Sequence, residues 1–128
     1  SAIIKGPINI FGNDYDTKDG TAVRDYIHVT DLADAHIKSL QWITDNNKSL
    51  KINLGVGTGY SVLEVIKAAE KYCDINLDIN HVERREGDPP VLIADNTLSK
   101  TLLNWHPQYS DIATIIKSAW SWHQQQHK

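Results

Sequence analysis

The sequence predicts an α/β fold, in which short strands alternate with about four helices. Runs at 7–12 and 76–83 are typical of strands, whereas 61–73 repeats its apolar residues every third or fourth position. The alternation of these two patterns along one chain is typical of α/β proteins. Because the chain has 128 residues, we expect 1–128 to form a single domain.

The first two strands are expected at 7–12 and 23–29. The first run reads PINIFG and ends at a glycine, and the second alternates apolar and polar side chains. The polar stretch 13–21 between them contains Asp19-Gly20, the strongest turn dipeptide in the chain. We therefore predict that the two runs pair as a ribbon with a long loop.

The first helix is expected over about 31–45, with Thr30 or Asp31 as its cap. Its buried stripe would consist of Leu32, Ala35, His36, Leu40 and Ile43. A second helix follows Ser61 and Glu64, which match the S-x-x-E capping box. Its buried face would consist of Val62, Val65, Ile66, Ala69, Tyr72 and Cys73.

Two further strands are expected at 51–55 and 76–83. A third helix starts near residues 96–97 and stops before Pro107, since a residue that precedes proline avoids the helical conformation. Ser110 is expected to cap the last helix. The apolar face of that helix would consist of Ile112, Ile115, Ile116, Ala119, Trp120 and His123.

Composition and charge exclude several classes of function. The chain carries 13 basic and 16 acidic residues and no basic stripe, so a nucleic-acid partner is not expected. No apolar run approaches the ~20 residues that span a bilayer, so no membrane partner is expected either. The one cysteine, Cys73, rules out an internal disulfide and fits the reducing cytoplasm. The spacing of the six histidines does not match a metal site.

A glycine-rich segment, GVGTGY at 55–60, follows a predicted strand and precedes a helix. Its pattern is G-x-G-x-G, whereas the dinucleotide fingerprint needs its third glycine one place later, where Tyr60 stands. We therefore interpret this segment as a turn that leads into a capped helix rather than as a cofactor loop. The start of that helix could still face an anionic ligand, as any helix N-terminus can.

Two charged segments are candidates for a binding site. Residues 84–88, RREGD, combine guanidinium forks that suit phosphate oxygens with a carboxylate that can accept hydrogen bonds from ribose. A solvated turn with a local ion pair explains the same residues without a ligand. Arg24 lies in a predicted strand, where it can belong to such a site or simply pair with Asp25 or Asp31.

Three stretches together carry a resemblance to a known family. They are IFGNDYDTKDGTAVRDYIHVTDLADAH (10–36), INLGVGTGYSVLEVI (52–66) and RREGDPPVLIAD (84–95). In this order they resemble the C-terminal part of the UDP-glucose 4-epimerases, also called UDP-galactose 4-epimerases, of the extended short-chain dehydrogenase/reductase superfamily. The stretch DGT-x-VRDYIHV-x-DLA is specific to these enzymes and their nearest relatives.

The resemblance implies that the chain is the substrate-binding portion of an NAD-dependent isomerase. Such enzymes oxidise the C4 hydroxyl of a UDP-hexose to a ketone and return the hydride to the other face, with NAD held by an N-terminal Rossmann half. The Tyr-x-x-x-Lys pair and glycine fingerprint of that half are missing here. We therefore expect no catalytic or cofactor-binding residue, and an inactive fragment. The absence of methionine fits a chain cut from a longer one.

The resemblance also assigns substrate contacts residue by residue. Arg24 and Arg85 match the arginines that reach the diphosphate, and Asp88 matches the acid that accepts from ribose. Leu92 stands where side-chain size is thought to gate N-acetylated sugars, and leucine leaves dual specificity open. The remaining positions are Asn9, Ile10 and Phe11 on the uracil side and Tyr26 and Val62 near the nucleotide.

Partners follow from the same resemblance. We expect UDP-glucose or UDP-galactose as ligand, an exposed apolar face where the Rossmann half docks, and a homodimeric parent. One alternative is the substrate domain of another nucleotide-sugar enzyme of the superfamily, such as a dehydratase or decarboxylase. A second alternative is a non-enzymatic interaction domain, in which Arg24, Arg85 and Asp88 would not share a pocket.

Overall fold

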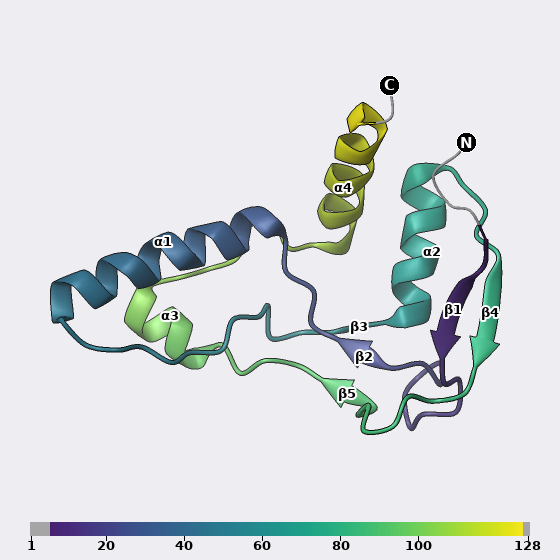
Figure 1. Ribbon diagram of the computed structural model, residues 1–128, viewed down its shortest axis with the longest axis horizontal. Helices are drawn as coiled ribbons and strands as arrows, with labels where there is room; N and C mark the ends of the chain where they lie inside the picture. The colour runs from purple at the N-terminus through teal and green to yellow at the C-terminus, as the bar shows by residue number, and fades with distance from the viewer. Residues whose placement is uncertain (1–5, 127–128) are drawn as a thin grey trace.

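The helices gather in two groups at the two ends of an elongated molecule (Figure 1). The computed structural model describes residues 6–126. Helix α1 (Val29–Asn46) lies beside α3 (Thr97–Leu103), and α2 (Val62–Cys73) lies beside α4 (Ile112–Gln126). Short strands connect the two groups, so the predicted α/β class is confirmed.

The strands form two small sheets. β1 (Ile8–Phe11) pairs in parallel with β4 (Ile79–Val82) at the end of the molecule that holds α2. β2 (Val23–Arg24) is the central strand of the other sheet, between antiparallel β3 (Tyr60–Ser61) and parallel β5 (Val91–Leu92). Each strand of this second sheet has only two residues, so few ladder hydrogen bonds hold it together.

The predicted ribbon between 7–12 and 23–29 is wrong. β1 pairs with β4 instead, because α2 reverses the chain before β4 begins and parallel strands need such a crossover. The loop between the two predicted strands closes on itself, with the Tyr15 amide donating to the Gly20 carbonyl at 2.9 Å. The chain therefore enters the second sheet, where only Val23–Arg24 is paired.

The capping box of α2 is confirmed. Ser61 Oγ accepts from the Glu64 amide at 3.0 Å, and the Glu64 carboxylate accepts from the Ser61 amide at 2.8 Å. Both bonds are local, which is why the sequence alone could specify them. Ile66 is buried on the predicted face, and Cys73 is half-buried at the end of the helix. The third helix and the strand at 76–83 also lie where they were expected.

Helix α1 starts two residues earlier than predicted and has a different cap. His28 is the cap, and its Nδ1 accepts from the Thr30 amide at 3.0 Å. Histidine is not among the residues that usually cap helices, so the sequence pattern favoured Thr30 or Asp31. His28 is buried, and its Nε2 lies 2.8 Å from Ser118 Oγ on α4.

Asp31 links the first turn of α1 to the segment before α4. Its carboxylate accepts from the amides of residues 108 and 109 and from Ser110 Oγ, at 2.6–2.9 Å. The prediction that Ser110 caps the last helix is therefore wrong, because its Oγ donates to Asp31. Asp111 fills that role, since its Oδ1 accepts from the Thr114 amide at 2.9 Å.

A buried tryptophan forms the centre of the group made by α1 and α3. Trp105 has no exposed surface, packs with Ala35 and Leu103, and donates from Nε1 to the Asp31 carbonyl at 3.0 Å. The residues that pack against this core are Ile27, Trp42, Leu50, Ile52 and Leu54. The predicted strand at 51–55 is wrong, because among residues 6–126 this segment has no partner strand.

The predicted buried stripe of α1 is also wrong, apart from Ala35. Five apolar residues of helix α1 instead form an exposed surface, which we call the α1 apolar face. This face consists of Val29, Leu32, Ile37, Leu40 and Ile43, which are 37–74% exposed. His36 is exposed too, and none of the residues of α4 described here is fully buried. Within residues 6–126, no helix combines the length and apolar character needed to cross a bilayer.

Candidate functional site

Arg24 and Asp88 form an ion pair that joins β2 to the loop after β4. The two side chains are 23% and 28% exposed, so the pair is accessible from solvent. Arg24 also donates from Nη1 to the Val23 carbonyl at 2.7 Å, which fixes the direction of the guanidinium. The sequence had suggested Asp25 or Asp31 as the partner of Arg24, and this is wrong because both carboxylates accept backbone amides elsewhere.

Arg85 lies beside this pair in the same loop. The Asp88 amide donates to the Arg85 carbonyl at 3.3 Å, which closes a turn over residues 85–88. The Arg85 guanidinium carbon is 4.0 Å from the centroid of the Phe11 ring, at the end of β1. Arg85 is exposed, and no carboxylate of the described residues pairs with it. Its donors are therefore available to a ligand.

The three predicted contacts on β1 differ in their exposure to solvent. Ile10 is 1% exposed and paired with His81 of β4, so it has almost no surface to offer a ligand. Asn9 is exposed, and its Oδ1 accepts from Asn80 Nδ2 of β4 at 3.0 Å. Phe11 is half-buried and keeps one ring face toward Arg85. Phe11, at the end of β1, is thus the predicted contact on this strand that touches Arg85.

Three further predicted contacts lie around β2: Tyr26 in the segment between β2 and α1, Val62 at the start of α2, and Leu92 in β5. Leu92 of β5 lies directly opposite Arg24 in the parallel register and is 58% exposed. Tyr26 is half-buried, and burial raises the pKa of its hydroxyl although the charge of Arg24 acts in the opposite direction. Val62 opens α2 and donates from its amide to the Ala22 carbonyl at 3.0 Å, just before β2.

The glycine-rich segment does not offer its amides to a phosphate. The backbone amides of Val56 and Gly57 in its first turn donate to the carboxylate of Asp25 at 2.9 and 3.0 Å. A dinucleotide loop needs such donors for the pyrophosphate. The geometry therefore agrees with the interpretation of 55–60 as a structural turn, and this turn does not fit the pyrophosphate of NAD.

The start of α2 is likewise occupied from within the chain. Ser61 Oγ donates to the Asp19 carboxylate, and Asp19 also accepts from the Thr21 amide at 3.0 Å. Burial by itself would raise the pKa of Asp19, but these hydrogen bonds, the one from Ser61 foremost, lower it below its ordinary value. A carboxylate already stabilises this helix end, so it is not a free anion site.

Arg84 has a different environment from its neighbour Arg85, which the sequence did not reveal. Its Nε donates to Asp14 Oδ1 at 2.7 Å, and its guanidinium carbon is 4.3 Å from the centroid of the Tyr15 ring. The hydrogen bond from Arg84 lowers the pKa of Asp14. A Cβ at Gly12 would lie 2.6 Å from Tyr15 and 2.8 Å from Arg84, so the glycine allows this close packing.

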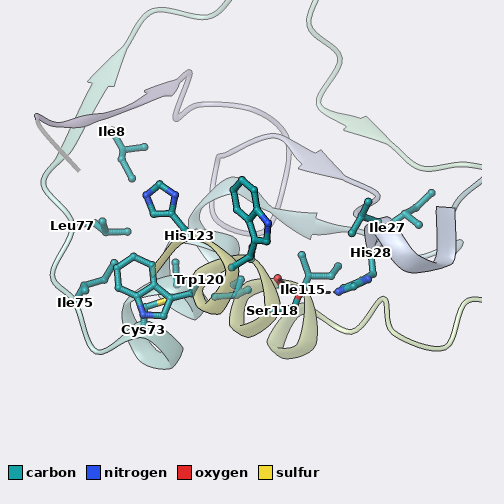
Figure 2. Close-up of a pocket in the computed structure, with 15 residues that line it drawn as sticks. Ile8, Ile27, His28, Cys73, Ile75, Leu77, Ile115, Ser118, Trp120 and His123 are labelled. Carbon is teal, nitrogen blue, oxygen red and sulfur yellow. Dashed lines mark hydrogen bonds between the residues drawn. The ribbon is translucent and has the colours of Figure 1, made fainter. Parts of the chain in front are cut away.

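A large hollow lies away from these residues. It is an apolar groove of about 920 Å³ bounded by β1, α2 and α4 (Figure 2). None of the predicted substrate contacts lines it. A smaller hollow of about 370 Å³ lies beside Arg84, at the ends of β1 and β4. Among residues 6–126, no group of three or more histidine, cysteine or acidic side chains could hold a metal ion.

Known proteins resemble the chain in sequence. The family model "NAD dependent epimerase/dehydratase family" matches residues 2–55. The UDP-glucose 4-epimerase of Rhizobium meliloti is 48% identical over 119 residues, which are 93% of this chain and 36% of that protein. The chain belongs to the UDP-glucose 4-epimerase family. It corresponds to the C-terminal part of these proteins and spans about 36% of the length of the curated relatives it matches.

Solved structures of the family share the fold. The UDP-glucose 4-epimerase of Stenotrophomonas maltophila, solved with NAD and a formylated UDP-arabinopyranose, has a TM-score of 0.88 at 40% identity, over 94% of this chain and 36% of that chain. The enzyme of Bifidobacterium longum, solved with NAD+ and UDP, has a TM-score of 0.81 at 38% identity, over 93% and 35%. UDP-glucose 4-epimerases are isomerases, and this family is NAD-dependent.

Proposed function

We propose that this chain is the UDP-sugar-binding part of an NAD-dependent UDP-glucose 4-epimerase. The observation that supports the proposal is the ion pair between Arg24 and Asp88, which joins two distant parts of the sequence, with Arg85 in the same turn as Asp88. The family relationship supplies the reaction class, inversion at C4 of the hexose through a transient 4-keto sugar.

The chemistry of the cluster suits a nucleoside diphosphate. Arginine forks bind phosphate oxygens with two parallel hydrogen bonds, and Arg24 and Arg85 provide two such forks. Asp88 can accept from ribose hydroxyls, and the half-buried ring of Phe11 is an apolar group next to Arg85. UDP-glucose and UDP-galactose share this nucleotide, so the same residues would hold both.

The role of these residues is to bind and orient. Firm binding of the nucleotide, which does not react, can hold the hexose in position while its C4 centre is oxidised and reduced. When bound, NAD supplies the hydride chemistry. The glycine-rich turn at 55–60 does not fit NAD, since Asp25 occupies its Val56 and Gly57 amides. We therefore assign NAD to the N-terminal Rossmann half of the parent enzyme.

The state of the isolated chain is part of this proposal. We expect it to be inactive and to bind UDP-sugars weakly or not at all, because the other side of the pocket would come from the Rossmann half. The homodimeric state of the parent and its cytoplasmic location belong to the same proposal.

An epimerase assay on the full-length polypeptide that carries this sequence tests the proposal. We expect UDP-galactose to be converted to UDP-glucose, and the 128-residue chain alone to show no turnover with added NAD. Formation of a dehydrated or decarboxylated sugar would instead assign the chain to another enzyme of the superfamily. Turnover by the isolated chain would refute the proposal that NAD binding and catalysis belong to the N-terminal half.

A further inference from the structure

Asp25 links the chain segments next to the three strands of the sheet that contains Arg24. Its Oδ1 accepts from the Val56 amide at 2.9 Å, and its Oδ2 accepts from the amides of Gly57 at 3.0 Å and Ala94 at 3.3 Å. Val56 and Gly57 precede β3, and Ala94 follows β5. One carboxylate, directly after the central strand, thus binds backbone amides from the segments that flank both neighbouring strands.

These bonds matter because the strands themselves are so short. β2, β3 and β5 each have two residues, and Asp25 follows directly after the last residue of β2. Hydrogen bonds from backbone amides to a carboxylate are stronger than those between neutral groups. The Asp25 bonds therefore continue the sheet at the point where its ladder ends, and they fix Arg24 relative to Leu92, its partner in register.

The Asp25 carboxylate packs closely against the backbone of Gly55. A Cβ at Gly55 would lie 2.4 Å from Asp25 Oδ2 and 2.5 Å from the Ala94 side chain. The backbone of Gly55 is held in turn by Asn96, whose Nδ2 donates to its carbonyl at 2.8 Å. The glycine at position 55 therefore permits the approach of Asp25 to both flanking segments.

We infer that Asp25 is a positioning residue for the UDP site, which acts by holding Arg24 and the β5 segment in place. This inference rests on the proposed function, because it takes Arg24 as the diphosphate contact. Asp25 lies between Arg24 and Tyr26, a second proposed contact, so its carboxylate anchors the backbone segment that carries both side chains. The sequence signal was an acid between two candidate contacts, which we had interpreted only as a possible local partner of Arg24.

The experiment compares Asp25→Asn with the unmodified full-length polypeptide. Asparagine keeps the shape of the side chain, but its amide nitrogen cannot accept the Gly57 and Ala94 amides. We expect the KM for UDP-galactose to rise about tenfold with kcat changed less than twofold, because binding geometry is lost while the reacting groups lie elsewhere. Gly55→Ala, which displaces the same carboxylate, should have an effect of the same direction.

A comparison of ligands separates positioning from general stability. UDP affinity should fall in Asp25→Asn, while uridine affinity should change little, because uridine lacks the diphosphate. In an Arg24→Ala background, Asp25→Asn should produce little further loss of UDP affinity, since both variants remove the same contact. Asp34→Asn is the matched control, because it removes a carboxylate whose partner is Lys38 on α1, outside the site.

Two outcomes would overturn the inference. Equal losses for UDP and uridine, or a lower melting temperature with an unchanged KM, would show that Asp25 is merely structural. Failure of the proposed function gives a different result, because Arg24→Ala would then leave UDP affinity unchanged. If Arg24→Ala weakens UDP binding and Asp25→Asn does not, only the positioning role of Asp25 is refuted.

Discussion

Arg24 and Asp88 are 64 positions apart in the sequence and form an ion pair between β2 and the loop after β4. Each is only about a quarter exposed, so the pair is partly shielded from water but still reachable by a ligand. A pair in this setting gives the cluster a defined geometry before any ligand arrives. The proposed UDP site is therefore built around a contact between two parts of the chain.

Arg24→Lys should weaken substrate binding although it keeps the positive charge. Lysine lacks the planar fork that can bind two phosphate oxygens at once, so we expect the KM for UDP-galactose to rise roughly 10-fold or more. Steady-state kinetics of the full-length polypeptide provide the measurement. A KM within twofold of the unmodified value would contradict the diphosphate role of Arg24.

Arg84 and Arg85 provide a matched pair of variants, because they are adjacent but have different partners. Arg85→Ala should raise the KM for UDP-galactose about tenfold and leave stability nearly unchanged, since no carboxylate of the described residues pairs with Arg85. Arg84→Ala should slightly lower the melting temperature, because it removes the contacts with Asp14 and Tyr15. The reverse pattern of effects would assign the ligand contact to Arg84.

Local features of the fold could be predicted from the sequence, whereas long-range partners could not. The Ser61–Glu64 capping box forms between residues three positions apart, so its residue types were sufficient to place α2. The ribbon was wrong because the choice of β4 as the partner of β1 depends on packing across the whole chain. A predicted strand at 51–55 has no partner here for the same reason.

The candidate site shows the same division. RREGD at 84–88 was identified as a binding segment from its residue types, but the separate environments of its two arginines depend on Phe11, Asp14 and Tyr15 near the start of the chain. The capping role of His28 was missed because histidine seldom occupies that position. The importance of Asp25 is visible only when Val56 and Ala94 are seen beside it.

Asp31 should make stability depend on pH in the acid range. Burial by itself would raise the pKa of this carboxyl, but the hydrogen bonds it accepts, the one from the Gln108 amide foremost, lower it below its ordinary value. A lowered folded-state pKa contributes stability above the unfolded pKa of about 3.9, and this contribution is lost as the pH falls through the folded value.

Asp31→Asn tests this dependence. We expect a loss of about 1–3 kcal/mol in the free energy of unfolding at pH 7, because two partly buried amides and the Ser110 hydroxyl lose a charged acceptor. Urea unfolding at pH 7 and at pH 3 measures the difference between variant and unmodified chain at each pH. That difference should be smaller at pH 3, and a difference that stays constant would contradict the account.

Gly20→Ala should destabilise the turn after β1 more than Gly87→Ala destabilises its own loop. Both glycines have positive φ, +80° and +76°, so alanine costs about 1 kcal/mol at each for conformation alone. At position 20, a Cβ would also lie 2.2 Å from the Asn13 carbonyl oxygen, whereas at position 87 nothing lies within 4 Å. Thermal unfolding of the two variants should therefore differ, and equal melting temperatures would refute the steric argument.

The α1 apolar face should cause the isolated chain to self-associate. Ile37 and Leu40 belong to this face and are 69% and 66% exposed. Exposed apolar patches of this kind mark surfaces that bind other proteins. We expect light scattering to show concentration-dependent association, which Ile37→Gln with Leu40→Gln should reduce. Trp122→Gln on α4 is the control, because Trp122 is exposed on a different helix. A clean monomer of the unmodified chain at high concentration would contradict this expectation.

A crystal structure of the full-length polypeptide with UDP tests the central claim most directly. The account predicts diphosphate oxygens within about 3 Å of guanidinium nitrogens of both Arg24 and Arg85, with a ribose hydroxyl at the same distance from the Asp88 carboxylate. UDP bound at another place, with Arg24 and Asp88 still paired to each other and free of ligand contacts, would contradict it.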